Sequence, residues 1–162
     1  MTRHDPTNLI QDFERTTWII ESQAKGLTHA DSVRQLPFRG NCFNWVVGHI
    51  LQSREVILTL LGGEPAWFPN RELDRYKRGS DPITSAAEAV PFEELLRVVR
   101  ESHEQIIARL KELDAAELAV IIDEERQRSL GERVAWFHWH ETYHTGQLEL
   151  LRQLAGTDDA II

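Results

Sequence analysis

Apolar residues recur three and four positions apart in four stretches of the chain, which is the period of a helix with one buried face. The stretches run from about residue 7 to 25, 43 to 61, 91 to 113 and 129 to 154. Gly26, Gly62 and Gly156 follow three of them as helix-ending signals. Ser129 and Glu132 form an S-x-x-E capping box at the start of the last. The pattern predicts an all-α protein, a four-helix bundle.

A long connection from Gly62 to Val90 joins the second and third helices. It is rich in proline and charged residues and has room for short helical turns. Connections of this length commonly cross the end of a bundle or line a binding site. A crossover here lets helices two and three run parallel.

The segment LAVII, residues 118 to 122, does not follow the helical period. Its residue types fit a short strand, whereas its isolation fits a packed turn. Because one strand without a partner is not stable, we expect an irregular apolar plug.

Composition and charge narrow the classes of function. The chain has 26 acidic and 18 basic residues and a net charge of -8, which repels a phosphate backbone. No stretch approaches the ~18 apolar residues of a membrane span, and MTRHDPTNLIQDFERT lacks the apolar core of a signal peptide. We expect one soluble, cytoplasmic domain over residues 1–162, with neither nucleic acid nor membrane as partner. Cys42 is the single cysteine, so a metal site must use histidine and carboxylate.

Three histidines are expected to face the bundle interior. His140 and His144 lie four residues apart on the last helix and share an apolar stripe with Leu148. His49 lies on the apolar face of the second helix. Three neutral imidazoles from facing helices can hold zinc or nickel and leave a position open for water or substrate.

His138 is expected to face solvent, because its helical face is polar. That face carries Glu141, Thr145, Glu149 and Arg152. Glu141 is then either a solvent-facing carboxylate or a general base at the rim of a metal site next to His140. Tyr143 is the other nearby side chain that can assist catalysis.

The remaining candidates have weaker patterns. His103 lies in the apolar stripe of the third helix and can be a fourth ligand, a hydrogen-bond partner behind the ligands, or a core residue satisfied by a carbonyl; we favour the last two. His4 and His29 belong to no cluster, and Cys42 fits a small buried residue. We leave these three out of the site.

The pattern H-E-x-x-H, from His140 to His144, is also the signature of zinc proteases. Those enzymes need a third ligand downstream, and in the extended pattern Leu150 stands where a histidine is required. Gly146 also lies one position too early. The protease interpretation is therefore not favoured.

The sequence NWVVGHI around His49, followed by H-x-x-x-H-x-G-Q from His140 to Gln147, resembles the DinB/YfiT superfamily of metalloenzymes over nearly the whole chain. The resemblance implies a four-helix bundle with a long crossover after helix two, commonly a homodimer. It also implies a metal triad of His49, His140 and His144. Members with understood chemistry use the metal with a low-molecular-weight thiol in S-transfer or isomerisation.

Three hypotheses follow. The first is an enzyme whose zinc or nickel activates a thiol or water for a small-molecule substrate, as a transferase or hydrolase, with Glu141 or Tyr143 assisting. The second is a non-catalytic or stress-related module with a structural metal, whose site is closed by His103 as the fourth ligand. The third is a dimeric bundle with hydrogen-bonded core histidines and no metal. We rank them in this order.

Overall fold

The computed structural model describes residues 5–157, apart from the side chains of residues 69–71. The elements are α1 (Pro6–Ala24), α2 (His29–Ser32), α3 (Phe43–Leu60), the 3₁₀ helix η1 (Pro69–Tyr76), α4 (Phe92–Glu112), α5 (Ala115–Leu118), β1 (Ile121–Asp123), β2 (Arg128–Ser129) and α6 (Leu130–Leu154). The predicted helices correspond to α1, α3, α4 and α6. Ser129 and Glu132 form the predicted capping box of α6, with side-chain to backbone hydrogen bonds in both directions.

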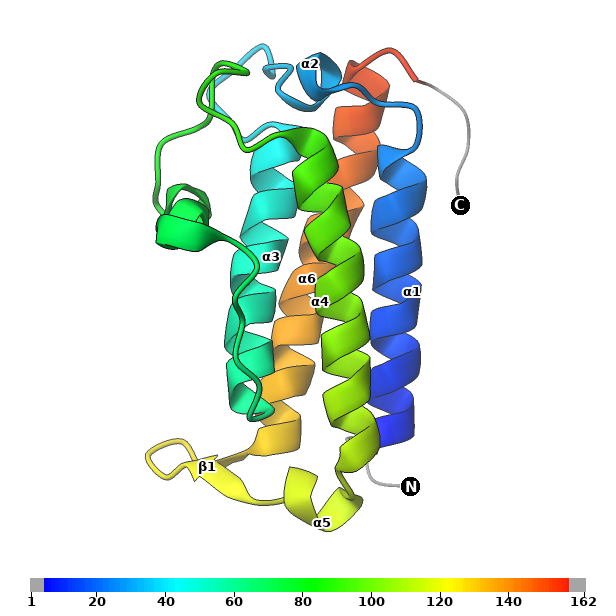
Figure 1. The fold of residues 1–162 in the computed structure, drawn as a ribbon, viewed down its shortest axis with the longest axis vertical. Helices are drawn as coiled ribbons and strands as arrows, with labels where there is room; N and C mark the ends of the chain where they lie inside the picture. Colours follow the sequence, from blue (N-terminus) through cyan, green and yellow to red (C-terminus); the bar gives the residue numbers. More distant parts are fainter. Residues whose placement is uncertain (1–4, 158–162) are drawn as a thin grey trace.

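The four long helices pack in a ring, in which α3 and α1 each contact both α4 and α6. Figure 1 shows that α3 and α4 run in one direction and α1 and α6 in the other. The predicted all-α bundle and its parallel second and third long helices are therefore confirmed. None of the helices within residues 5–157 combines the length and apolar character that a membrane span requires.

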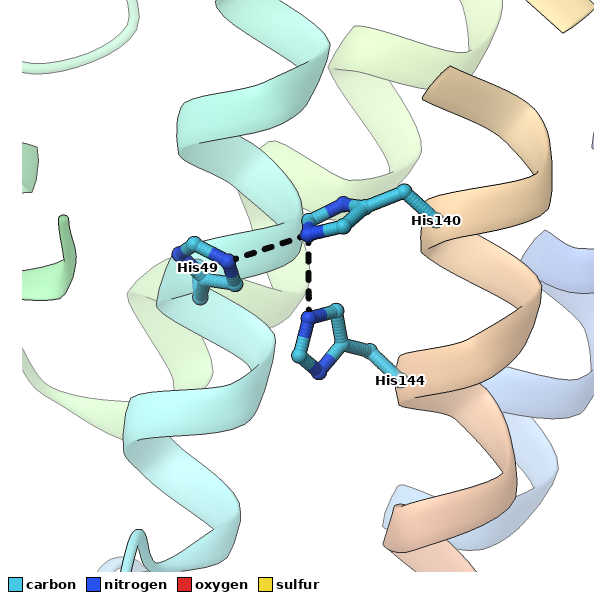
Figure 2. Close-up of side chains that lie close together, drawn as sticks. All are labelled: His49, His140 and His144. Carbon is cyan, nitrogen blue, oxygen red and sulfur yellow. Dashed lines mark hydrogen bonds between the residues drawn. The ribbon is translucent and has the colours of Figure 1, made fainter. Parts of the chain in front are cut away.

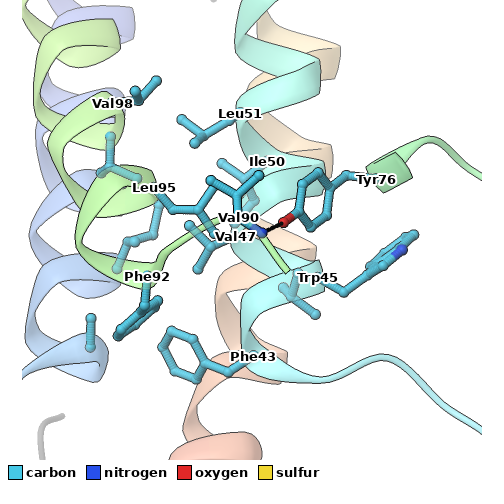
Figure 3. Packing of buried hydrophobic residues seen from close by; sticks show 14 of the residues in the cluster. Phe43, Trp45, Val47, Ile50, Leu51, Tyr76, Val90, Phe92, Leu95 and Val98 are labelled. Atoms are coloured by element: carbon cyan, nitrogen blue, oxygen red, sulfur yellow. Dashed lines mark hydrogen bonds between the residues drawn. The ribbon is translucent and has the colours of Figure 1, made fainter. Parts of the chain in front are cut away.

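The crossover between α3 and α4 is fastened to α3 by Tyr76 at the end of η1 (Figure 3). The Tyr76 hydroxyl donates to Asn44 Oδ1 (2.8 Å) and accepts from the Val90 backbone N–H (3.0 Å). Asn44 in turn donates to the Val90 carbonyl (2.9 Å). The Tyr76 ring lies against Gly48, where a Cβ would stand 2.4 Å from the ring. The bare backbone at Gly48 thus allows the crossover to lie directly on α3.

Replacing Gly48 with alanine should therefore lower the free energy of unfolding by about 1–3 kcal/mol, because the added methyl group forces Tyr76 away from α3. Urea unfolding measures the change. Gly146→Ala is the matched control, since its Cβ would meet nothing within 4 Å. At this exposed helical position the substitution should raise the free energy of unfolding by about 0.5–1 kcal/mol, because alanine has a higher helix propensity than glycine. A similar loss at both glycines would contradict the close approach of Tyr76.

The core consists of two apolar clusters with a polar layer between them. One cluster packs the first half of α3 against the first half of α4 and the end of α6 (Figure 3). The other packs the start of α1 and the end of α3 against the second half of α4. On each long helix a buried polar residue lies between the clusters: Thr16, Arg54, Ser102 and Glu141. These polar residues must bond to one another, because water does not reach them.

The segment after α4 differs from the prediction. Instead of an irregular plug, α5 is followed by a two-stranded hairpin in which Ile121 pairs with Ser129 and Asp123 with Arg128. Leu118 is buried, whereas Val120, Ile121 and Ile122 are exposed. The partner strand consists of Arg128 and Ser129, whose residue types give no strand signal, and the prediction therefore missed the pairing.

Candidate metal centre

His49 of α3 and the pair His140 and His144 of α6 point their rings at one another across two packed helices (Figure 2). His140 Nε2 lies 3.3 Å from His49 Nε2 and 3.1 Å from His144 Nε2. One nitrogen of each ring lies within 4.8 Å of the other two. The three predicted metal ligands are thus brought together.

The other nitrogen of each ring has an oxygen partner. His49 Nδ1 lies 2.7 Å from the Tyr76 carbonyl, which can only accept, so Nδ1 carries the proton. His144 Nδ1 lies 2.7 Å from Gln147 Oε1, and His140 Nδ1 lies 3.4 Å from Ser53 Oγ. The Nε2 atoms of His49 and His144 therefore carry lone pairs, and both lie within 3.3 Å of His140 Nε2.

Two of the three spacings between the Nε2 atoms match those around a bound cation. Nitrogens about 2.0–2.1 Å from a tetrahedral metal lie about 3.3–3.4 Å apart, close to the 3.3 and 3.1 Å between His140 Nε2 and its neighbours. A proton on His140 Nε2 can point at only one neighbour at a time. A metal ion satisfies all three lone pairs at once, so the donor set fits a divalent metal.

An aromatic ring packs on each histidine. Trp45 stacks on His49 with ring centroids 4.8 Å apart, and Trp136 stacks on His140 at 5.8 Å. Tyr143 meets His144 edge to face at 5.2 Å. These contacts restrict the rotation of the ligand rings.

Burial keeps the three imidazoles neutral. It is the main cause that lowers the pKa of His49 and of His144. Burial, followed by the charges of His144 and His49, lowers the pKa of His140 to about 4. All three rings are therefore neutral near pH 7, the form that binds metal.

The histidines line a cavity of about 880 Å³ between α3, α6 and the crossover. Trp45, Trp136 and Trp139 provide its aromatic surface. Tyr143, 60% exposed, lies on the same lining beside His144. The centre is thus accessible to a small molecule.

Glu141 is placed differently from both expectations: it is neither solvent-facing nor at the rim. Its side chain is 0% exposed and lies in the polar layer of the core. Arg54 binds both carboxylate oxygens, through Nε to Oε2 (2.9 Å) and Nη2 to Oε1 (2.6 Å). Thr16 donates to Oε1 (2.6 Å). With its oxygens occupied in this way, Glu141 has a structural role and we no longer assign it as a base.

The prediction that the His138 face is solvated was wrong, because α1 packs on it. Glu141, Thr145 and Arg152 are buried there, and only Glu149 is exposed. His138 is half-buried with its ring edge-on to Phe13 at 5.0 Å. Polar residues on a helix were taken as a solvent face, but here they bond within the core.

His103 lies outside the triad. It is half-buried, and its Nδ1 is 3.2 Å from the Thr17 hydroxyl, which accepts from Arg54 Nη2 (2.8 Å). His103 thus extends the polar layer of the core. His29 links the Ala86 carbonyl to the Phe92 backbone N–H, and Cys42 is buried. His4 lies outside the described residues.

Several residues that support the site were not predicted. Arg54 interrupts the apolar face of α3, which is the signal that a paired buried charge leaves in a sequence. Gln147 lies three residues after His144 on the same helix, which places it beside that ligand. Ser53 of α3 instead contacts His140 of α6, a contact between helices that spacing along the chain does not indicate. Tyr76 lies far from His49 along the chain, and nothing in the sequence indicates their contact.

The fold and the site together define a four-helix bundle with three histidines that can hold a metal. The DinB superfamily matches residues 12–148, and the chain therefore belongs to that superfamily. The crystal structure of a conserved protein from Enterococcus faecalis is similar in fold, with a TM-score of 0.72, 16% sequence identity and coverage of 93% of this chain and 97% of that one. No curated protein matched the sequence. Homodimer formation and cytoplasmic location stay predictions.

Proposed function

We propose that this chain is a divalent-metal-dependent enzyme in which His49, His140 and His144 hold zinc or nickel beside a substrate cavity. The convergence of three Nε2 atoms on the lining of that cavity carries the proposal. Imidazole nitrogens without a carboxylate suit zinc and nickel rather than magnesium or calcium. The reaction classes that we propose are thiol-dependent S-transfer and hydrolysis of a small molecule.

The residues of the chain prepare this chemistry. A divalent metal lowers the pKa of a coordinated thiol or water, which supplies a nucleophile at neutral pH. Tyr76 and Gln147 hold the Nδ1 protons of His49 and His144 and so keep the ligand lone pairs directed inward. Tyr143 lies beside His144 on the cavity lining, and we assign its hydroxyl to hold or donate a proton at the substrate.

The alternative, a non-catalytic module with a structural metal, has less support. Structural zinc sites are closed by four protein ligands, whereas the clustered ligand group among the described residues has three. His103, the candidate fourth ligand, bonds to Thr17 instead. The open cavity beside the histidines favours an enzyme.

Metal content tests the proposal. Protein purified without an affinity tag is equilibrated with zinc or nickel and analysed by elemental mass spectrometry. We expect about one metal per chain, lost in His49→Ala and in His144→Ala, because two histidines alone bind far more weakly.

The matched control is His103→Ala, which removes a half-buried histidine outside the triad and should keep the metal. Loss of metal in that variant would favour a closed structural site. A parent protein without metal would overturn the proposal and leave a bundle with hydrogen-bonded core histidines.

A further inference from the structure

The cavity lining differs in charge from the rest of the protein. Arg39 and Arg78 line it, and none of the described lining residues is a carboxylate, although the net charge of the chain is -8. A pocket with this sign attracts anions to a molecule that otherwise repels them.

The two arginines are not equivalent. Arg39 Nη2 forms an ion pair with Asp81 Oδ1 at 3.0 Å, so its charge is compensated. Arg78 is exposed and has no ion-pair or hydrogen-bond partner within residues 5–157. Arg78 is therefore an uncompensated cation on the cavity lining that also carries the three histidines.

A fixed turn holds the backbone of Arg78 at the cavity. Ser80 N–H donates to the Lys77 carbonyl at 3.0 Å, and Gly79 has φ +86°, as the third position of a type II turn requires. Ser80 Oγ accepts from Trp45 Nε1 at 3.0 Å, which ties the turn to α3. Because Trp45 also stacks on His49, the turn that carries Arg78 is fixed relative to the metal centre.

We propose that the substrate of this site is a small organic carboxylate whose anionic end is bound by Arg78 and whose reacting end lies at the three histidines. The inference rests on the proposed function, which places the reaction there. A single guanidinium matches the two oxygens of a carboxylate. A carboxylate is favoured over a phosphate because it carries one negative charge, which the single uncompensated guanidinium of the described lining can balance. Trp45 and Trp136 line the part of the cavity that would hold the apolar middle of such a substrate, between its anionic end and its reacting end.

The test compares thiols of different charge on cobalt-loaded protein: mercaptopropionate and mercaptopropanol, which are matched in length, and the cation cysteamine, which is one carbon shorter. Dissociation constants come from cobalt–sulfur absorption and from tryptophan fluorescence, which reports occupancy of the cavity even without a cobalt–sulfur bond. We expect mercaptopropionate to bind about fivefold more tightly than mercaptopropanol, the upper range for an exposed charge pair. Cysteamine should bind most weakly, and added salt should reduce the preference.

Arg78→Ala should remove the preference and leave the affinity for mercaptopropanol unchanged. Arg126→Ala, which removes an exposed arginine of the hairpin away from the cavity, has the same change in net charge and should keep the preference. Equal binding of the anion and the neutral thiol, or a preference that survives in Arg78→Ala, would overturn the inference and leave the proposed function intact. Failure of cobalt to bind overturns both. The thiols can also change the fluorescence without giving cobalt–sulfur absorption. If the preference is then lost in Arg78→Ala, the result supports binding of a carboxylate by Arg78 and rules out a metal-bound thiol in the proposed function.

Discussion

Glu141→Gln is expected to lower the free energy of unfolding by about 3–5 kcal/mol, because it removes one partner of a buried ion pair. Arg54 and Glu141 are both 0% exposed. All five N–H donors of Arg54 have partners, two of them on Glu141 and the others on Thr17, Val99 and Ser102. Glutamine leaves the guanidinium charged in a place that water does not reach. Urea unfolding at neutral pH measures the loss.

The matched control is Glu149→Gln, a change of the same charge at an exposed position of α6, which should alter stability by less than about 0.5 kcal/mol. The double variant Arg54→Met with Glu141→Leu should be more stable than either single variant, since no unpaired charge remains. A loss of under about 1 kcal/mol in Glu141→Gln would contradict the assignment of a buried ion pair.

The contribution of Glu141 should depend on pH in one direction. Although burial alone raises the pKa of this carboxyl, the charge of Arg54 and its hydrogen bonds hold it below the ordinary value of 4.5. A lowered pKa in the folded state means that the stabilisation is fully present above that ordinary value and is lost as pH falls through the folded-state pKa. The difference between parent and Glu141→Gln should therefore shrink in acid.

Zinc at about one hundred times its dissociation constant is expected to raise the free energy of unfolding by about 2.7 kcal/mol. The gain should vanish in His49→Ala and persist in His103→Ala, since only the former removes a ligand. Thermal unfolding with and without zinc measures it. Nickel should act in the same way, because all three ligands are imidazoles.

The unfolding experiment without zinc also distinguishes an enzyme site from a structural metal site. Without metal the protein should stay folded, because the two apolar clusters and the ion pair between them do not include the ligands His140 and His144. A structural metal predicts unfolding when a chelator is added. Loss of helix on chelation would therefore favour the structural alternative.

The helical part of the fold was predictable because each long helix buries an apolar stripe. Ser129 and Glu132 mark the start of α6 through local hydrogen bonds, which depend only on neighbouring residues. His140 and His144 were predictable as a pair for the same reason, since four residues bring side chains to one face. The membership of His49 in the site could be predicted on one further assumption, that α3 and α6 pack together.

The features that escaped prediction depend on contacts between distant residues. The ion pair of Arg54 and Glu141 buries two charged side chains in the core, whereas a pattern of polar positions predicts that charged side chains face solvent. The bond from His49 to the Tyr76 carbonyl involves a backbone group, and every residue type carries one. Periodicity describes which face of a helix is apolar and contains no information about such partners.

The anchoring of the crossover at Tyr76 has a consequence for protein engineering. Tyr76 and Val90 hold the two ends of a segment on α3, and the Tyr76 carbonyl orients His49. Arg78 and Ser80, which line the cavity, lie inside that segment. Residues 77–82 therefore form a segment into which other sequences can be grafted to change the cavity lining, while the anchors at Tyr76 and Val90 are kept on either side.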